Sequence, residues 1–318
     1  MSAAGDGFAV GTPGVSAESF WLPKHYVTSA WYEHAPFAAW VIAATRPRLL
    51  VELGTHNGFS FFAFGDAVVK LGLDTSMVAV DSWEGDDQAG FYGADVKDSV
   101  QAMVEEDYPF ASLRQGYFDA IAPTFVDGSI DLLHIDGRHG YDDVKEDYES
   151  YESKLSDRAV VLFHDTREYQ ETFRVHRFWD ELAEKHPSFT FEHGHGLGVL
   201  AHGSQVPQPV LEFLARATAD PAGMRSFYAR LGAEVSRQRV LQVDHFDIIH
   251  ELRLRVMADE AALAAQRERS TRIVHRFVSS TSWRVTAPLR TIGSAMHHKS
   301  RQDAKDHGGE PHGATGTD

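Results

Sequence analysis

The sequence contains no cysteine, has a deficit of positive charge and carries no long apolar run. Without thiols the chain can form no disulfide, Cys-ligated zinc site, iron–sulfur cluster or cysteine nucleophile. Its 30 Lys and Arg against 46 Asp and Glu give a formal net charge of −16, which argues against a nucleic-acid binder. No stretch reaches the roughly 18 apolar residues of a transmembrane segment, and residues 1–14 lack the parts of a signal peptide. We therefore expect a soluble, cytoplasmic protein.

The length of 318 residues allows about two domains, and the charge changes along the chain. Residues 1–203 hold 14 basic and 33 acidic residues, whereas residues 204–318 hold 16 and 13. Residues 203–209 have the composition of a linker, which predicts a domain boundary near Gly203 and an extension over 204–293. Residues 1–15 and 294–318 are small, polar or rich in His and Gly, and we expect them to be disordered.

Helix and strand patterns alternate between the predicted termini. Residues 16–47 predict two short N-terminal helices, broken near Pro23 and Pro36. Apolar runs predict strands over 48–53, 76–80, 112–115, 130–135, 159–163, 189–192 and 197–201. Helices are expected between them over 59–71, 96–106, 141–154 and 168–185. This order indicates an α/β fold with a Rossmann-like, doubly wound, mostly parallel seven-stranded sheet that ends in an antiparallel hairpin.

A glycine-rich loop joins the first predicted strand to its helix. It reads Val51-Glu52-Leu53-Gly54-Thr55-His56-Asn57-Gly58-Phe59-Ser60. Gly54 permits a tight turn, Gly58 permits close approach of a ligand, and the helix N-terminus offers N–H groups to an anion. The spacing is neither that of a NAD fingerprint nor that of a P-loop. The alternative is a strand-to-helix turn that binds nothing.

Asp81 ends the second predicted strand, and Ser82 and Trp83 follow it. An acidic residue at this place can accept hydrogen bonds from both ribose hydroxyls of a nucleotide. The alternative is that Asp81 caps a helix. Tyr117 and Phe118 follow the third strand, where an adenine ring would stack.

Asp136 and His164-Asp165 end two consecutive strands, which a parallel sheet would place side by side. Two carboxylates and an imidazole can hold a divalent cation, although each Asp could instead cap the helix that follows. His139 lies three residues after Asp136, where a neutral imidazole could take the proton of an acceptor hydroxyl.

Together these motifs resemble class I S-adenosylmethionine-dependent methyltransferases, of the family that includes sugar and macrolide-sugar O-methyltransferases. The resemblance covers residues 48–203 and rests on the glycine loop, Asp81-Ser-Trp-Glu-Gly-Asp86, His134-Ile-Asp136-Gly-x-His139-x-Tyr141 and His164-Asp165. It implies that S-adenosylmethionine is bound by Glu52, Gly54, Thr55, Gly58, Ser60, Asp81, Ser82, Trp83, Tyr117, Phe118 and Asp136.

The metal-dependent members of that family further imply a metal site and a base. The metal would be Mg²⁺ or Mn²⁺ on Asp136, His164 and Asp165, and His139 would be the base. His164 departs from the family pattern, which has Glu, Asp or Asn there, and imidazole is a poorer Mg²⁺ ligand than carboxylate. His56 replaces the middle glycine of the common loop. An enzyme without a metal therefore stays open.

The resemblance implies an O-methyltransferase that acts on a sugar hydroxyl of a glycan, cell-surface polysaccharide or glycosylated metabolite. Two other readings stay open: a non-catalytic scaffold of polysaccharide assembly and a metal-dependent oxygenase on the same fold.

Apolar residues repeat at three- and four-residue spacing over about 245–278, which predicts a long amphipathic helix that could form a coiled coil. Ser282-Trp-Arg-Val-Thr-Ala-Pro-Leu-Arg290 then resembles a short element near the ends of bacterial glycosyltransferases and other polysaccharide-assembly proteins. Residues 245–293 could therefore mediate homo-oligomerisation or contact a polysaccharide-assembly partner. Alternatively, they pack on their own domain.

Overall fold

The computed structural model describes residues 8–86, 90–91 and 93–290. The predicted disordered tail 294–318 and the first seven residues of the predicted disordered N-terminus lie outside the described residues. The chain divides into two units, Met1–His245 and Phe246–Asp318.

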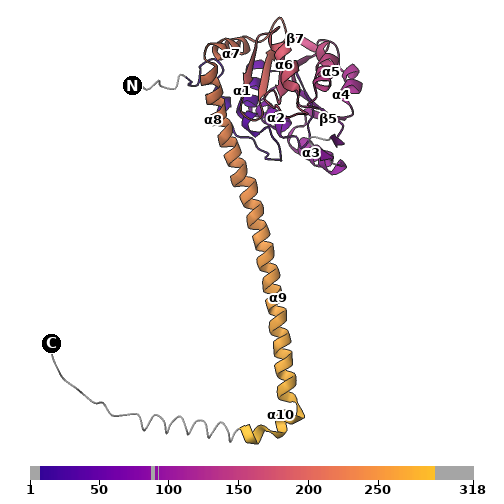
Figure 1. Ribbon diagram of the computed structural model, residues 1–318, viewed down its shortest axis with the longest axis vertical. Helices are drawn as coiled ribbons and strands as arrows, with labels where there is room; N and C mark the ends of the chain where they lie inside the picture. Colours follow the sequence, from indigo (N-terminus) through magenta and orange to yellow (C-terminus); the bar gives the residue numbers. More distant parts are fainter. Residues whose placement is uncertain (1–7, 87–89, 92, 291–318) are drawn as a thin grey trace, which may run out of the picture. The chain divides into compact units, whose positions relative to one another are not determined.

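A seven-stranded sheet forms the centre of the first unit (Figure 1). Its strand order is β5-β2-β1-β6-β7-β9-β8. The strands are β1 (Leu49–Leu53), β2 (Ser76–Asp81), β5 (Ala111–Gln115), β6 (Ile130–Ile135), β7 (Leu155–His164), β8 (Ser188–Phe191) and β9 (Leu197–Ala201). Strands β5, β2, β1, β6 and β7 each pair in parallel with the next strand in this order. Strand β9 pairs antiparallel with β7 and with β8. The predicted doubly wound sheet and terminal hairpin are thus confirmed. A second, two-stranded pair, β3 (Gly85–Asp86) and β4 (Gly90–Phe91), was not predicted.

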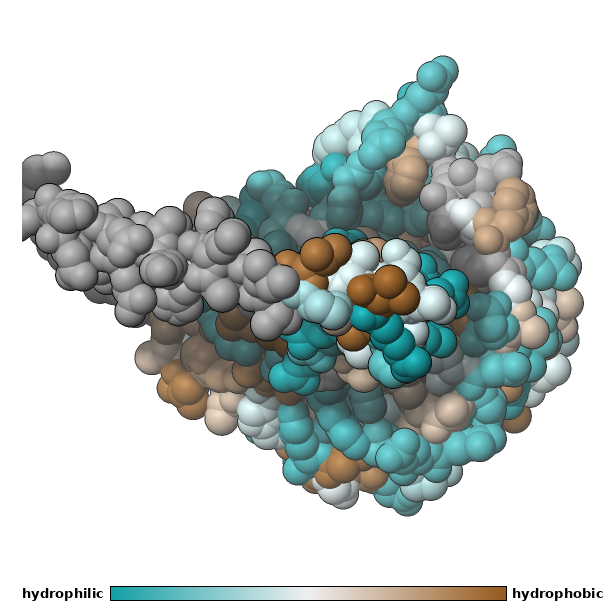
Figure 2. Space-filling model, turned by 90° about the horizontal axis from the view of Figure 1, so that it is seen from below, coloured by the Kyte–Doolittle hydropathy of each residue, from teal (hydrophilic) through white to brown (hydrophobic). Residues whose placement is uncertain are grey.

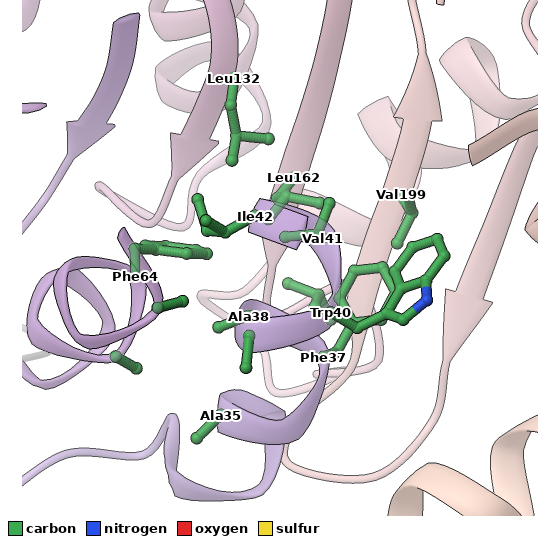
Figure 3. Packing of buried hydrophobic residues seen from close by; sticks show 14 of the residues in the cluster. Ala35, Phe37, Ala38, Trp40, Val41, Ile42, Phe64, Leu132, Leu162 and Val199 are labelled. Carbon is green, nitrogen blue, oxygen red and sulfur yellow. The ribbon is translucent and has the colours of Figure 1, made fainter. Parts of the chain in front are cut away.

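Helices cover both faces of the sheet, because successive strand residues point to opposite sides. On one face, Leu50 and Leu132 belong to a core cluster with α1 (Ala35–Thr45), α2 (Phe59–Leu71), α3 (Ala94–Asp107), α7 (Gln208–Ala219) and α8 (Pro221–Arg239). On the other, Val51 and Leu133 pack with α4 (Phe118–Ile121), α5 (Tyr141–Glu152) and α6 (Val175–Ala183). Figure 3 shows Val41 and Ile42 of α1 beside Leu162 of β7. Helix α1 is therefore part of the central core.

The N-terminal region differs from the two helices predicted over residues 16–47. It forms two 3₁₀ turns, Ala17–Phe20 and Tyr32–His34, and a single α-helix that begins at Ala35. Pro36 lies in the first turn of that helix, where the missing proline N–H costs no hydrogen bond. This proline therefore starts a helix and does not break one.

Residues 8–15 are ordered, contrary to the disorder predicted from their composition. The ring of Phe8 stacks on that of Phe227, with 5.5 Å between centroids, and Val15 is buried. The Tyr228 hydroxyl donates a hydrogen bond to the carbonyl oxygen of Gly14, 2.7 Å away and 214 positions earlier in the chain. A local sequence pattern does not reveal contacts between such distant residues.

The predicted boundary near Gly203 is wrong, because α7 and α8 belong to the first unit. The ring centroid of Phe213 on α7 lies 4.9 Å from that of Trp40 and 5.4 Å from that of Phe37, both on α1. Tyr228 of α8 is fully buried. The change in net charge near residue 203 therefore does not mark a domain boundary, because the core packing continues across it.

The second unit contains the predicted long helix. Helix α9 (His245–Ser279) has 35 residues and follows a π-helical turn, Val240–Asp244. Helix α10 (Thr281–Val285) comes next. Figure 2 shows hydrophobic residues beside hydrophilic ones on the described surface nearest the viewer. Across the described residues, no helix combines the length and the hydropathy that crossing a membrane requires.

Candidate active site

A cavity of about 650 Å³ lies at the carboxyl ends of the parallel strands, the place where open α/β sheets bind ligands. It brings together most of the residues predicted from the sequence. These are Gly54, Thr55, Gly58, Ser60, Asp81, Ser82, Tyr117, Phe118, Asp136, His139, His164 and Asp165. Glu52 and Trp83, also predicted to bind the cofactor, are not among the residues that line it.

The glycine loop has the backbone conformation that its glycines predict. Gly54 and Gly58 have φ values of +84° and +88°, in the left-handed region. A Cβ on Gly54 would lie 2.0 Å from the carbonyl oxygen of Asp136. Gly58 caps α2 without a side-chain hydrogen bond, so the first turn of the helix presents N–H groups to a ligand. Thr55 lines the cavity, and its buried hydroxyl makes no hydrogen bond within the described structure.

Asp81 holds this loop against the end of β2. Its Oδ2 atom accepts hydrogen bonds from the backbone N–H groups of Thr55 and His56, both at 2.8 Å, and Oδ1 accepts one from Trp83 N at 2.7 Å. Each carboxylate oxygen can accept more than one hydrogen bond, so a ribose hydroxyl could still bind. Trp83 is buried, and its indole Nε1 donates to the His56 carbonyl oxygen, 3.2 Å away. It therefore supports the loop from behind.

Glu52 lies beneath the loop and not at its surface. Its side chain is fully buried, and its Oε2 atom lies 2.9 Å from Nδ1 of His134 on the neighbouring strand. Burial raises the pKa of the Glu52 carboxyl, although hydrogen bonds from His134 and Ser60 oppose this. The prediction of a direct cofactor contact for Glu52 therefore does not agree with its position.

Glu84 is a cavity residue that the sequence analysis missed. It lies three residues after Asp81 and accepts a hydrogen bond from the Tyr117 hydroxyl at 3.0 Å. The motif Asp81-Ser-Trp-Glu contained it, but only the turn after β2 brings it to the cavity wall. Tyr117 itself is 61% exposed, with its ring free for a ligand to cover.

The cluster at the ends of β6 and β7 forms as the sequence predicts. Ile135 pairs with Phe163, so Asp136 and His164 follow at the same level of the sheet. The Nδ1 atom of His164 lies 3.1 Å from Oδ1 of Asp136 and 3.4 Å from Oδ2 of Asp165. His139 approaches from the next loop, with Nε2 2.8 Å from Oδ2 of Asp165.

Acceptor oxygens lie beside both ring nitrogens of His164. Its Nε2 atom lies 3.1 Å from the carbonyl oxygen of Gly194, which can only accept. Burial lowers the pKa of the His164 imidazole, but the carboxylates of Asp136 and Asp165 raise it by more, to well above its usual range. An imidazolium has no lone pair for a metal, which disfavours the predicted ligand role of His164.

With His139 in place of His164, the cluster could still hold a cation. Asp136, His139 and Asp165 each offer one ligand atom, and these atoms lie within 4.8 Å of one another. Burial lowers the pKa of His139, but the hydrogen bond and charge of Asp165 raise it above its usual value. The His139 ring stacks on that of Phe173, with 4.4 Å between centroids. His139 is thus held in place from two sides.

The loop after β7 contributes more of the wall than predicted. The helix expected from Glu168 begins at Val175, and residues 168–174 form a loop instead. Glu168, Gln170 and Phe173 of this loop line the cavity. Among the described residues, the cavity wall includes nine acidic residues and one arginine, and this excess of acidic groups favours a cation.

Comparison with known proteins agrees with this geometry. Residues 51–166 match a family model described as a methyltransferase domain. An uncharacterized protein of Sinorhizobium fredii, y4gI, is 46% identical over 192 residues, which are 60% of this chain and 21% of that protein. The chain therefore spans about a fifth of the length of this relative.

Two solved structures resemble the chain over about half its length. A methyltransferase from Geobacter sulfurreducens is 17% identical, with a TM-score of 0.41 over 54% of this chain and 78% of that one. The O-methyltransferase TomG from Streptomyces achromogenes, solved with S-adenosylmethionine, is also 17% identical, with a TM-score of 0.42 over 57% and 84%. The strand order and the glycine loop agree with the match of residues 51–166 to the methyltransferase-domain model.

Proposed function

We propose that this protein is an S-adenosylmethionine-dependent O-methyltransferase that acts on a sugar hydroxyl of a glycan or glycosylated small molecule. One observation carries the proposal. The pair His139–Asp165, with 2.8 Å between Nε2 and Oδ2, faces the same cavity as the glycine loop and Asp81. A nucleotide-binding loop and a base oriented by a carboxylate are the two parts that transfer of a methyl group to a hydroxyl requires.

S-adenosylmethionine, when bound, would supply the methyl group from its sulfonium. The glycine loop and the residues around it fit this cofactor as follows. The uncapped N-terminus of α2 would bind the carboxylate of the methionine part. Asp81 and Glu84 would accept hydrogen bonds from the ribose, and Tyr117 would cover the adenine ring. The excess of carboxylates in the cavity wall would attract the positively charged sulfonium.

His139 would remove the proton of the acceptor hydroxyl as its oxygen bonds to the methyl carbon, while the bond from that carbon to sulfur breaks and the sulfonium becomes a neutral thioether. Asp165 orients the imidazole through Nε2 and would stabilise its charge after the proton has moved. A positioned base of this kind contributes about 10²–10⁴-fold in rate, and alignment of the hydroxyl with the methyl group contributes further.

The acceptor would lie at the end of the cavity beyond His139. Phe173 provides an aromatic ring there. The Oε1 atom of Glu168 lies 2.6 Å from Nδ1 of His195, within hydrogen-bond distance. Ser29 and Asn57 line the cavity as well. The ring of Phe173 beside several hydrogen-bonding groups suits a polyhydroxylated acceptor better than an apolar one.

A divalent cation is an alternative to the base. Asp136, His139 and Asp165 fit such an ion by their donor atoms and spacing. When bound, it would lower the pKa of an acceptor hydroxyl. His139 would then be a ligand and could not take the proton, so the two roles exclude each other. We favour the base, because the imidazolium of His164 already places a positive charge between Asp136 and Asp165.

Isothermal titration calorimetry with S-adenosylmethionine tests the cofactor. We expect saturable binding with a micromolar Kd that Asp81→Ala abolishes. Asp180→Ala, an exposed change on α6 away from the cavity wall, is the matched control and should bind like the wild type. If the folded wild-type protein binds no cofactor, the proposal fails. If it binds, nucleotide sugars and glycans are the acceptors to assay for methyl transfer.

A further inference from the structure

The last described part of the second unit has a charge opposite to that of the whole chain. Residues 267–290, here called the arginine segment, contain six arginines and one acidic residue, Glu268, in a chain with a net charge of −16. Glu268 pairs with Arg272 at 3.2 Å. Among the described residues, no carboxylate lies within 4 Å of the guanidinium nitrogens of Arg269, Arg276 or Arg284. The segment therefore presents uncompensated positive charge.

These charges lie beside exposed apolar side chains. Arg269, Arg272 and Arg276 follow one another at three- and four-residue spacing and share one face of α9. Ile273 and Phe277, four residues apart on the adjoining face, are 68% and 59% exposed. A helix with a basic face beside an apolar face is the form that lies in the plane of a membrane surface.

The turn after α9 adds an aromatic residue in a fixed position. The Ser280 side chain caps α10 by accepting from Trp283 N, and the Trp283 ring lies 4.7 Å from that of Phe277. The Arg290 guanidinium stacks 3.6 Å above the same ring and donates to the Trp283 carbonyl oxygen at 2.6 Å. Val285 and Leu289, two and six residues after Trp283, are also exposed. Tryptophan and arginine side by side suit the boundary between lipid and water.

We propose that the arginine segment binds an anionic phospholipid surface. A second copy of the chain fits this segment less well. In a coiled coil, the helix positions that face the partner helix are apolar. Three of these positions in α9 hold Asp259, Gln266 and Ser270, which separate the apolar residues of the segment from those earlier in α9. Anionic headgroups match the arginines, and the acyl boundary matches Ile273, Phe277, Val285 and Leu289. Binding at the surface needs no helix that crosses the membrane.

Sedimentation of the full-length protein with vesicles tests this inference. We choose vesicles of phosphatidylcholine with about 30% phosphatidylglycerol as the anionic surface. We expect the protein to bind these vesicles and to bind vesicles of phosphatidylcholine alone only weakly. Salt should release the protein, because interactions of exposed charges weaken as the ionic strength rises. Each basic residue near the surface contributes about fivefold. The double variant Arg276→Glu with Arg284→Glu should therefore lower the partition coefficient by about 25-fold or more.

The matched control is Arg253→Glu with Arg255→Glu, which reverses two charges on the same helix outside the segment. It should bind nearly as well as the wild type. A third variant, Val285→Ser with Leu289→Ser, should weaken binding without changing any charge. The inference is overturned if the wild type ignores anionic vesicles, or if the control loses as much binding as Arg276→Glu with Arg284→Glu. Loss of vesicle binding in parallel with loss of a dimer, measured by sedimentation velocity, would also overturn it in favour of a coiled coil. The assay uses no methyl transfer, so its result is independent of the proposed function.

Discussion

The Nε2 atom of His164 donates a hydrogen bond to the carbonyl oxygen of Gly194, 3.1 Å away, and so ties the end of β7 to the hairpin between β8 and β9. His34 reaches the same oxygen with its own Nε2 at 2.9 Å. The shared acceptor turns the Nδ1 atom of His164 toward Asp136 and Asp165. Burial raises the pKa of both carboxyls, but the charge and hydrogen bond of His164, joined for Asp165 by those of His139, together lower it by more. Both are therefore ionised at neutral pH, and His139 is the group in the cluster whose charge can change.

Replacement of His139 should separate catalysis from binding. His139→Ala removes the proposed base and should lower kcat by about 10²–10⁴-fold, because the hydroxyl proton then has no positioned acceptor. Affinity for S-adenosylmethionine should stay within about twofold, measured by calorimetry on the same sample. An unchanged kcat would show that another group takes the proton.

The pH dependence should report the same imidazole. The base acts as neutral His139, so kcat should rise with pH through a pKa that Asp165 holds above 6.5. Asp165→Asn removes the charge that raises this pKa, and the rising limb of the kcat profile should move to lower pH. A limb that stays in place would mean that His139 does not control it.

Chelation distinguishes the base from the cation. If His139 is the base, treatment with EDTA followed by gel filtration should leave both kcat and the thermal midpoint of unfolding unchanged. Elemental analysis of the same protein should find less than one equivalent of any divalent metal. A drop in both quantities that Mg²⁺ or Mn²⁺ restores would assign Asp136, His139 and Asp165 to a metal instead.

Asp147 should make the fold less stable as the pH rises. Burial and the neighbouring charges of Asp143 and Glu146 raise its pKa to about 8, and its Oδ2 atom has no hydrogen-bond partner within the described structure. The folded state binds this proton more tightly than the unfolded state. The contribution to stability is therefore complete below about pH 4 and is lost as the pH rises through 8.

Urea denaturation between pH 5 and 9, without ligand, measures this effect. The free energy of unfolding of the wild type should fall over that range, and Asp147→Asn should make the fall shallower. Asp127→Asn, on an exposed carboxylate, serves as the control and should follow the wild-type curve. Parallel curves for wild type and Asp147→Asn would contradict the assignment.

Gly54→Ala tests the loop. The added Cβ would meet the Asp136 carbonyl oxygen at 2.0 Å, and the φ of +84° is strained for alanine. We expect a lower thermal midpoint and loss of cofactor binding. Gly72→Ala also has a positive φ but has open space around its Cβ, so it should cost stability while leaving binding intact.

The sequence alone determined the sheet, its hairpin and most of the residues around the cavity. Apolar runs of strand length ended in Asp81, Asp136 and Asp165, and the carboxyl ends of parallel strands meet at one edge. Local residue types are sufficient to predict such features. This is why the long helix α9 was also predicted, because its periodicity depends only on residues three and four apart.

Only the tertiary structure decided the features that depend on distant contacts. It placed Glu52 beneath the loop with His134, and it put acceptor oxygens beside both ring nitrogens of His164, which disfavours the predicted ligand role of His164. It also packed Phe8 on Phe227 and joined α7 and α8 to the first unit. Burial and protonation depend on which groups surround a side chain in space. These neighbours come from other strands and helices, so the linear order of residues does not reveal them.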